Sequence, residues 1–364
     1  MKISLITELD SFDQVKERWN SLVDNDPYST VFQRHEFIKS WWKAFGGSSE
    51  LMILVVSDKG GRIMAAAPLM LSRRYENLLP QRVVTLIGSD NWAADYSVFP
   101  FDPDFPEAAR MIFDWLNIHR ETWDQIVIKN VPGKALSLKG LEEYFSLWHY
   151  PVCRNRLQDA PTILFNKLED PEKILRKKSL VRHFNYFKRN GELNFTEVSE
   201  ACLIKPFMED FFSQHIERRR AAGDKSQFLQ KSQREFYYSM LTEFDGSGIL
   251  KFSVVTFNDQ PIAFHFGFQY KLRYYWYKPT FNPALSKHSP GEVLLRFLIQ
   301  SALEKDLREF DFGAGSEKFK YRFANHIRKL DELRIIDSAI AYAAFCGRAG
   351  LRQVRSWLLG RESN

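Results

Sequence analysis

The stretch SPGEVLL at residues 289–295 predicts the start of a helix. Its place among the other predicted elements indicates the fold. A serine before the helix, a proline at its first position and an acid in its first turn are typical of a helix N-terminus. A glycine at the second position lets another molecule approach backbone N–H groups that have no partner within the helix. Those donors and the positive end of the helix dipole favour a pyrophosphate ligand. An ordinary capped helix remains the alternative.

Hydrophobic periodicity on both sides of this stretch predicts an order of strands and helices. The elements predicted before it are a strand, two helices and three strands, at residues 193–198, 203–220, 231–244, 249–257, 261–269 and 273–278. From the stretch onward we predict a helix, a strand, a helical turn and a strand, at residues 291–305, 309–313, 317–323 and 332–337. The stretch therefore lies between the fourth strand and the third helix of a mixed α/β unit.

The N-terminal half runs in the same order of predicted elements. They are a strand, two helices, three strands, a helix and a strand, at residues 3–7, 12–23, 35–45, 51–57, 62–71, 82–87, 106–119 and 124–129. No residue-level repeat relates the halves, so the duplication is inferred from element order. We expect an N-terminal lobe, a C-terminal lobe entered through a basic linking helix, and a helical tail, at residues 1–160, 161–337, 171–190 and 338–364 respectively.

The composition indicates a folded protein of about two domains. With 45% hydrophobic and 26% charged residues, the 364-residue chain is neither disordered nor fibrous. Its long apolar run at residues 63–71 falls short of the roughly 20 residues that span a bilayer. The three cysteines have no metal-ligand spacing and the histidines form no metal-binding pattern, so we expect a cytoplasmic protein without a metal site. The net charge of +6 is compatible with an anionic ligand but selects none.

This element order, with a phosphate-compatible turn between the fourth strand and the third helix, resembles the GNAT fold of acyl-CoA-dependent N-acyltransferases. The sequences SPG at 289–291 and FDFGAGSEKFK at 310–320 are similar to the signature of its CelD-like branch. That branch is related to the FemAB-type transferases, which have two such lobes. Further similar stretches lie at residues 32–37, 41–42, 45–46, 65–69, 95–96 and 215–223.

The resemblance implies an enzyme that transfers an acyl group, in the simplest case acetyl, from acyl-CoA to an amine of a small molecule or sugar. It also implies a connection to polysaccharide or cell-envelope synthesis. In this fold the fourth and fifth strands, here residues 273–278 and 309–313, separate around the pantetheine arm of the co-substrate. The first lobe has no recognisable donor loop, so we expect it to shape the acceptor groove.

Attack of an amine on a thioester requires a general base and a group that stabilises negative charge on the carbonyl oxygen. We predict catalytic roles for Asp311, Glu317 and Tyr277; the resemblance implies the last as proton donor to the leaving thiolate. For the acyl-CoA we predict contacts with His288, Ser289, Pro290, Gly291 and Glu292. For the acceptor substrate we predict contacts with Asp95, Tyr96, His265, Arg218 and Lys320.

Structural roles remain open for several of these residues. Asp311 can instead accept N–H groups of the glycine-rich turn, and Glu317 with Lys320 can form a surface ion pair. His265 can be a hydrogen-bonded core residue.

Two other functions also remain open. One is a FemAB-type aminoacyl transfer from charged tRNA, which the basic residues at 176–189 favour and the lack of a heptad run disfavours. The other is a non-catalytic scaffold in a polysaccharide-synthesis complex. Outside the first alternative we expect no nucleic acid partner. We expect the amphipathic tail at residues 348–358 to pack on its own domain rather than on a membrane. The sequence does not indicate the oligomeric state.

Overall fold

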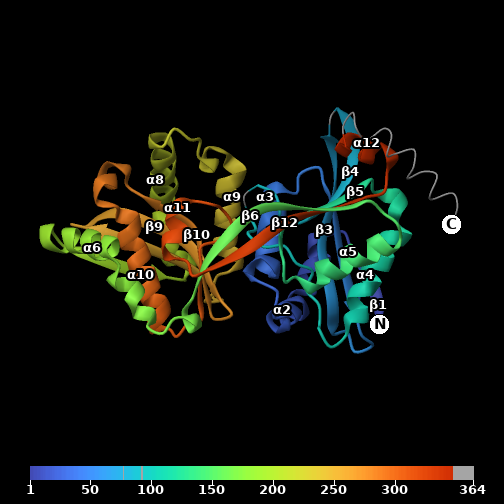
Figure 1. The fold of residues 1–364 in the computed structure, drawn as a ribbon, viewed down its shortest axis with the longest axis horizontal. Coiled ribbons are helices and arrows are strands. Elements are labelled where there is room, and N and C mark those ends of the chain that lie inside the picture. Colours follow the sequence, from blue (N-terminus) through green and yellow to red (C-terminus); the bar gives the residue numbers. More distant parts are fainter. Residues whose placement is uncertain (77, 92, 347–364) are drawn as a thin grey trace. The chain divides into compact units, whose positions relative to one another are not determined.

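The computed structural model describes residues 1–76, 78–91 and 93–346, and the chain divides into two units (Figure 1). Unit 1 contains Met1–Gln158 and Lys329–Asn364, and unit 2 contains Asp159–Arg328. The expected second lobe extended to residue 337. In the structure the last strand, β12 (His326–Ile336), instead pairs over most of its length with β5 (Gln125–Pro132) of unit 1. Backbone hydrogen bonds to β5 therefore return the end of the chain to the first unit.

Unit 1 contains a mixed sheet with the strand order β1-β2-β3-β4-β5-β12. Its other strands are β1 (Lys2–Ile6), β2 (Glu50–Ser57), β3 (Ile63–Glu76) and β4 (Leu79–Leu86). Only β4 and β5 are parallel neighbours; the remaining pairs in this order are antiparallel. Its helices are α1 (Leu9–Asp13), α2 (Lys16–Asn25), α3 (His35–Phe45), α4 (Pro106–Ile118), α5 (Leu136–Leu147) and α12 (Ala339–Cys346).

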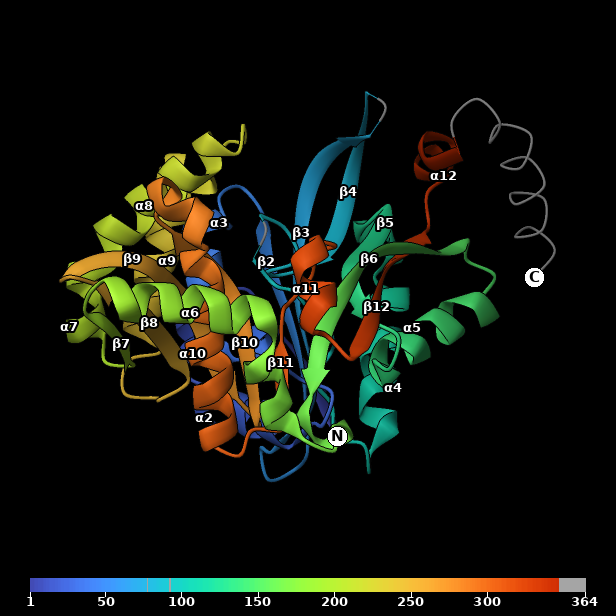
Figure 2. The same cartoon turned by 60° about the vertical axis from the view of Figure 1, so that its left-hand side comes forward.

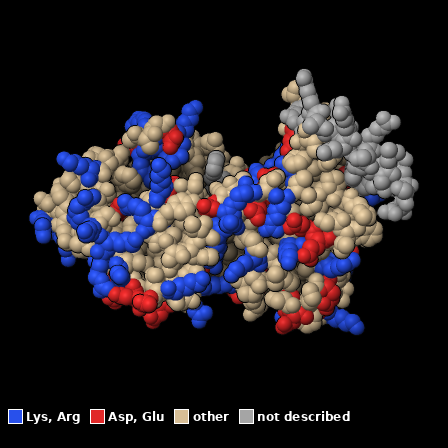
Figure 3. All heavy atoms as spheres, in the orientation of Figure 1, with Lys and Arg blue, Asp and Glu red and all other residues tan. Residues whose placement is uncertain are grey.

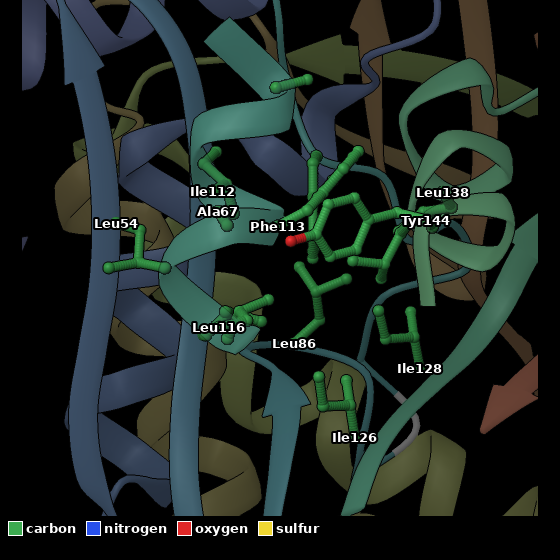
Figure 4. Packing of buried hydrophobic residues seen from close by; sticks show 14 of the residues in the cluster. Leu54, Ala67, Leu86, Ile112, Phe113, Leu116, Ile126, Ile128, Leu138 and Tyr144 are labelled. Atoms are coloured by element: carbon green, nitrogen blue, oxygen red, sulfur yellow. The ribbon is translucent and has the colours of Figure 1, made fainter. Parts of the chain in front are cut away.

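The core of unit 1 lies between this sheet and the helices α4 and α5 (Figure 4). Phe113 and Leu116 of α4 and Tyr144 of α5 pack with Leu86 and Ile126 of the strands. Burial of each such side chain stabilises the fold by about 1.5–3 kcal/mol. β2 and most of β3 are buried at nearly every position, as in strands covered on both faces.

Unit 2 repeats this architecture with the order β7-β8-β9-β10-β11-β6. Its strands are β6 (Val152–Leu164, shared with unit 1), β7 (Leu193–Val198), β8 (Leu250–Phe257), β9 (Gln260–Tyr270), β10 (Arg273–Phe281) and β11 (Glu309–Asp311). Its helices are α6 (Lys178–Asn190), α7 (Ala201–Ile204), α8 (Met208–Ala221), α9 (Lys231–Glu243), α10 (Pro290–Glu304) and α11 (Lys318–Phe323). Figure 2 shows α6 and α10 side by side over the strands, where they enclose one hydrophobic cluster.

Two predicted helices are divided in the structure. The linking helix expected at 171–190 begins as a 3₁₀ helix, Pro171–Arg176, and becomes α6 only at Lys178. The helix expected at 203–220 is interrupted between α7 and α8, where Pro206 stands. A proline lacks the N–H group and its ring clashes with the preceding turn, so a regular α-helix does not continue through it.

Within the described ranges, no helix combines the length and the apolar character needed to cross a membrane. Of the predicted tail at 338–364, α12 is the described part. It contacts β3 and β4, and residues 347–364 lie outside the described chain.

Candidate functional site

The parallel strands β10 and β11 separate after three paired residues. Arg273 to Tyr275 lie opposite Glu309 to Asp311, where β11 ends, whereas β10 continues to Phe281. Among the described residues, no strand pairs with this edge of β10 beyond Tyr275. This divergence has the position that the resemblance implies for the pantetheine arm.

A break in the register of β10 coincides with the divergence. The pairing of β10 with β9 is irregular between Tyr275 and Lys278, and His265 of β9 accepts the N–H of Tyr277 through Nε2 at 3.2 Å. Its ring stacks on Trp276 at 5.1 Å and lies over Gly267, where a Cβ would come within 2.0 Å of it. Burial lowers the pKa of His265 to about 3, so the ring is neutral. Complete burial contradicts the predicted substrate contact of His265: its ring fills the irregularity instead.

The N-terminus of α10 follows β10 and has fewer available donors than the sequence suggested. Ser289 adopts a left-handed conformation with φ of 50°, and its carbonyl accepts the N–H groups of Glu292 and Val293 at 2.9 and 3.3 Å. Because Pro290 has no N–H, Gly291 is left as the first-turn donor without an acceptor in the described helix.

Gly291 also has a packing role. A Cβ at this position would lie 3.1 Å from the ring of Phe281, at the end of β10. Glycine therefore lets α10 lie close against the strand that borders the divergence.

The two other predicted donor contacts have protein partners. Glu292 forms an ion pair with Arg322 of α11, and His288 stacks on Tyr186 of α6 with ring centroids 3.6 Å apart. Their contact with an acyl-CoA remains a prediction, as does that of Ser289, Pro290 and Gly291.

Three further charged side chains predicted to serve the site belong to α11, to the residue before it and to α8. Lys320 of α11 is buried, and its Nζ donates to the carbonyl oxygen of Ala314 at 3.0 Å and to Oε2 of Glu317 at 2.8 Å. Gly315 makes room for that pair, since a Cβ there would lie 2.5 Å from the Glu317 carboxylate. Glu317 itself keeps 58% of its side chain exposed.

Arg218 of α8 is the third of these residues. Its guanidinium lies 5.5 Å from the centre of the Phe281 ring, and its Nε is buried without an acceptor. Burial, and then the neighbouring Arg219, lower the pKa of Arg218 to about 10, while Glu317 opposes that shift. Among the described residues, no carboxylate forms an ion pair with this partly buried guanidinium, which favours an anionic ligand at this place. The structure thus brings Arg218, Phe281 and Gly291 together.

The surroundings of Asp311 are those of a buried ion pair, which contradicts the predicted catalytic role. It is fully buried; Oδ2 lies 3.0 Å from Nη1 of Arg328 and 3.8 Å from Nη1 of Arg273. Its Oδ1 accepts the N–H of Gly313 at 2.8 Å. Glu309 bridges the same arginines, 3.1 Å from Arg273 and 2.6 Å from Arg328. The alternation of side chains along the strand does place Asp311 on the face opposite its two phenylalanine neighbours. The side chains of Arg273 and Arg328 fill that face.

Tyr277 lies on the edge of β10 beyond the paired residues and is almost fully buried. Its ring contacts Phe268 at 5.2 Å and Tyr237 at 6.2 Å, and Nζ of Lys278 lies 5.5 Å from it. Its role as proton donor remains a prediction.

In unit 1 the corresponding strands separate too, but the chain itself fills the space. β4 and β5 pair in parallel only at Val83 to Thr85 and Gln125 to Val127. Beyond these pairs, Asn130 donates through Nδ2 to the carbonyl of Ala94 at 2.8 Å and accepts the N–H of Ser97 at 3.0 Å. This occupation gives a physical reason for the lack of a donor loop in the first lobe.

The acceptor contacts predicted in unit 1 have different outcomes. Tyr96 is buried, its ring lies against Phe32 and its carbonyl accepts Nε2 of Gln33 at 2.8 Å, so its side chain is not available to a substrate. Asp95 is partly exposed and its contact with substrate remains a prediction.

Two functional-site neighbours, Arg273 and Arg328, were not predicted from the sequence; both form ion pairs with Glu309 and Asp311. The alternation of Glu309 and Asp311 with Phe310 signals a polar strand face, but nothing local to it indicates the distant Arg328. Among the described residues, no group of three or more histidine, cysteine, aspartate or glutamate side chains is placed to hold a metal ion.

Residues 176–321 match the family model described as an acetyltransferase (GNAT) domain. The match covers most of unit 2 and about 40% of the chain. No curated protein sequence matches it. Among solved structures, it is similar to the crystal structure of FemX, with a TM-score of 0.65 at 10% identity over 94% of this chain and 99% of that chain.

The chain also shares its fold with two further solved structures. One is the C-terminal domain of a putative lysylphosphatidylglycerol synthetase from Agrobacterium fabrum, with a TM-score of 0.56 at 13% identity over 92% of this chain and 95% of that chain. Another is L-PGS from Bacillus licheniformis, with a TM-score of 0.55 at 11% identity over 90% and 94%. At these identities the likeness is one of fold. It confirms the mixed α/β, two-lobed architecture, and the family match confirms the resemblance of residues 176–321 to a GNAT domain.

Proposed function

We propose that the protein transfers an acyl group from an acyl-CoA to an amine of a small molecule or sugar, with acetyl-CoA as the simplest donor. The observation that carries the proposal is the divergence of β10 and β11 beside the start of α10. An extended strand presents N–H and C=O groups in a row, and such a row suits the amide groups of a pantetheine arm. The Gly291 N–H and the helix dipole suit the pyrophosphate at the end of that arm.

Glu317 is the candidate general base, because its carboxylate is partly exposed and held beside Lys320. The amine nitrogen bonds to the thioester carbonyl carbon, the carbon–sulfur bond breaks, and the proton of the amine passes to Glu317. Tyr277 returns a proton to the CoA thiolate. Lys320 and Arg218 supply positive charge, the former toward the carbonyl oxygen and the latter toward an anionic group of donor or acceptor.

Isothermal titration with acetyl-CoA, free CoA and a long-chain acyl-CoA tests the donor. We expect saturable heat with all three, because they share the pyrophosphate and the pantetheine arm. No heat with any of them overturns the donor assignment. A screen of amines by release of the CoA thiol then tests transfer, and binding without transfer to any amine favours the non-catalytic scaffold.

A FemAB-type aminoacyl transfer from charged tRNA is the second candidate, and it rests on a basic surface of unit 2. Figure 3 shows lysine and arginine side chains gathered on one face of this unit. The exposed basic residues of the 3₁₀ helix and α6 are Lys173, Arg176, Lys177, Lys178, Arg182, Lys188 and Arg189. Binding of aminoacyl-tRNA that weakens steeply with salt, together with no heat from acyl-CoA, favours this candidate.

A further inference from the structure

Two residues of β10 face the helix α8. Lys278 and Thr280 are alternate residues of this strand, so their side chains lie on the same face of the sheet. They pair with Phe266 and Phe264 of β9, whose rings lie 6.3 and 6.4 Å from the ring of Phe211 in α8. Directly opposite residues of antiparallel strands share a face. Lys278 and Thr280 therefore lie on the face that α8 covers.

The helix α10 covers the opposite face. His265 follows Phe264 on β9, and its ring stacks on Trp276, which belongs to the hydrophobic cluster of α6 and α10. Successive residues of a strand point to opposite faces of the sheet. Figure 1 shows α8 and α10 on different sides of β9. The face with Lys278 and Thr280 is therefore not the face on which α10 begins.

Two buried polar atoms on the α8 side of β10 have no hydrogen-bond partner among the described residues. One is Oγ1 of Thr280, a residue with no exposed surface, and the other is Nε of Arg218. The guanidinium of Arg218 lies 5.5 Å from the ring centre of Phe281, the residue after Thr280, so the two donors lie close together. Buried donors without an acceptor indicate a place for an acceptor group from outside the chain.

The charged side chains beside these donors on α8 and β10 are cations. Burial, and then Lys278, Arg218 and Arg219, lower the pKa of His215 of α8 to about 2, so its ring is neutral. Lys278 donates through Nζ to Oε1 of Gln227, a neutral acceptor, at 3.1 Å. Positive charge is thus concentrated between α8 and β10.

Two carboxylates near these cations are bonded to other groups. Asp224 lies 3.4 Å from Arg219 in an exposed ion pair. Glu317 opposes the lowering of the Arg218 pKa, but its carboxylate lies 2.8 Å from Lys320. Among the described residues, no carboxylate forms an ion pair with Arg218. An anionic ligand would balance this charge and accept from the unpartnered donors.

We propose that the amine acceptor carries a carboxylate or phosphate group, which binds between α8 and β10 to Arg218, Lys278 and the Thr280 hydroxyl. This inference rests on the proposed acyl transfer. There the donor's pyrophosphate binds at the start of α10, so the α8 face is left for the acceptor. Glu317 acts on Arg218 electrostatically, so an acceptor held by its anionic group has its amine within reach of the candidate base.

Thermal unfolding in inorganic phosphate or acetate, compared with chloride at equal ionic strength, tests the anion site. We expect one of these anions to raise the Tm by at least about 2 °C in a saturable manner, and which anion does so separates phosphate from carboxylate. Arg218→Met and Thr280→Val are expected to fold in chloride, because each replaces a group that has no bonded partner with an apolar one, and to reduce the rise. Arg220→Met, at an exposed position of the same helix, is the matched control and keeps it. Equal stabilisation by all the anions, or an unchanged rise in Arg218→Met, overturns the proposal.

Paired amines test the assignment to the acceptor. We expect kcat/KM to be at least about tenfold higher for lysine than for cadaverine, or for glucosamine 6-phosphate than for glucosamine, and Arg218→Met to remove that preference. An anion response that disappears in saturating CoA assigns Arg218 to the donor and overturns the proposal. An anion response without any preference for anionic amines does so too. Absence of heat from acetyl-CoA is a failure of the proposed acyl transfer, and it is distinguishable because the anion response is measured without a donor.

Discussion

Asp311 and Glu317 lie six positions apart in the same segment, but their surroundings separate their roles. Asp311 is enclosed by two arginines and a backbone N–H, so groups of the protein itself balance its negative charge. Glu317 keeps more than half of its side chain exposed and has a single lysine beside it. A proton can therefore reach Glu317 from a bound amine, whereas Asp311 has no exposed surface to receive one.

Glu317→Gln is predicted to lower kcat by about 10²–10⁴-fold, because the amide cannot accept the proton of the amine. The Kd for acetyl-CoA is expected to stay unchanged in titration calorimetry. Glu235→Gln, which removes an exposed carboxylate paired with Lys231 at 3.2 Å on α9, is the control. A kcat for Glu317→Gln equal to that of this control places the general base elsewhere.

Asp311→Ala is predicted to destabilise the protein by about 3–5 kcal/mol, because it leaves buried arginines without part of their countercharge. Urea unfolding followed by circular dichroism measures this loss. Asp311→Asn still accepts the N–H of Gly313, so its loss is expected to be smaller. Should Asp311→Ala unfold at the wild-type urea concentration, the ion cluster has no stabilising role.

At the scale of elements, two groups of side chains lie at the place where β10 and β11 stop pairing. The ion cluster of Arg273, Arg328, Glu309 and Asp311 lies where the strands still pair, and His265 fills the irregularity where pairing stops. Buried charge clusters rarely stabilise more than apolar residues of equal volume do. Here the bonds of Arg273 with Glu309 and Asp311 link β10 to β11 at the register in which these strands pair.

Gly291→Leu is predicted to weaken acetyl-CoA binding by about tenfold or more, equivalent to about 1.4 kcal/mol. Its Cβ meets the Phe281 ring at 3.1 Å, so either α10 or Phe281 must move at the start of the helix. Gly133→Leu is the control, because a Cβ at Gly133 meets nothing within 4 Å. Wild-type affinity in Gly291→Leu removes this helix start from the donor site.

At the scale of the whole molecule, both units bury neutral histidines. Burial is the largest cause in each case, and it lowers the pKa of His35 in unit 1 to about 4 and those of His215 and His265 in unit 2 to about 2 and about 3. In the unfolded chain these rings titrate near 6.5. Below that pH the unfolded chain therefore binds more protons than the native protein does.

The free energy of unfolding is consequently predicted to decrease as the pH falls below about 6.5, by up to about 1.4 kcal/mol per pH unit for each histidine. Above that pH the histidines are neutral in both the folded and the unfolded chain, so their full contribution to the free energy of unfolding is retained. Urea titrations across this range measure the slope. His215→Asn removes one titrating ring and is expected to make the slope shallower; an unchanged slope contradicts the assignment to His215.

Local patterns predicted many elements to within a few residues. The helices at 35–45 and 231–243 and the strand at 193–198 follow from periodicity and turn residues, which act over neighbouring positions. α5 and most of β6 were not predicted. The hairpin strand β3 runs five residues beyond its expected end, because pairing with β4 extends it through residues 72–76, where the apolar run of the sequence has ended.

The amino-acid sequence by itself determined the order of elements, the helix start at 289–291 and the charged segment at 310–320, because caps, turns and periodicity are short-range. Only the tertiary structure decided which carboxylate of that segment stays exposed, Glu317, and which is buried, Asp311. Arg328 reaches Asp311 from 17 positions away, and Arg218 meets Phe281 from another helix. Whether a carboxylate can act as a base or has a structural role depends on the cations that folding places beside it, and those cations come from distant parts of the chain.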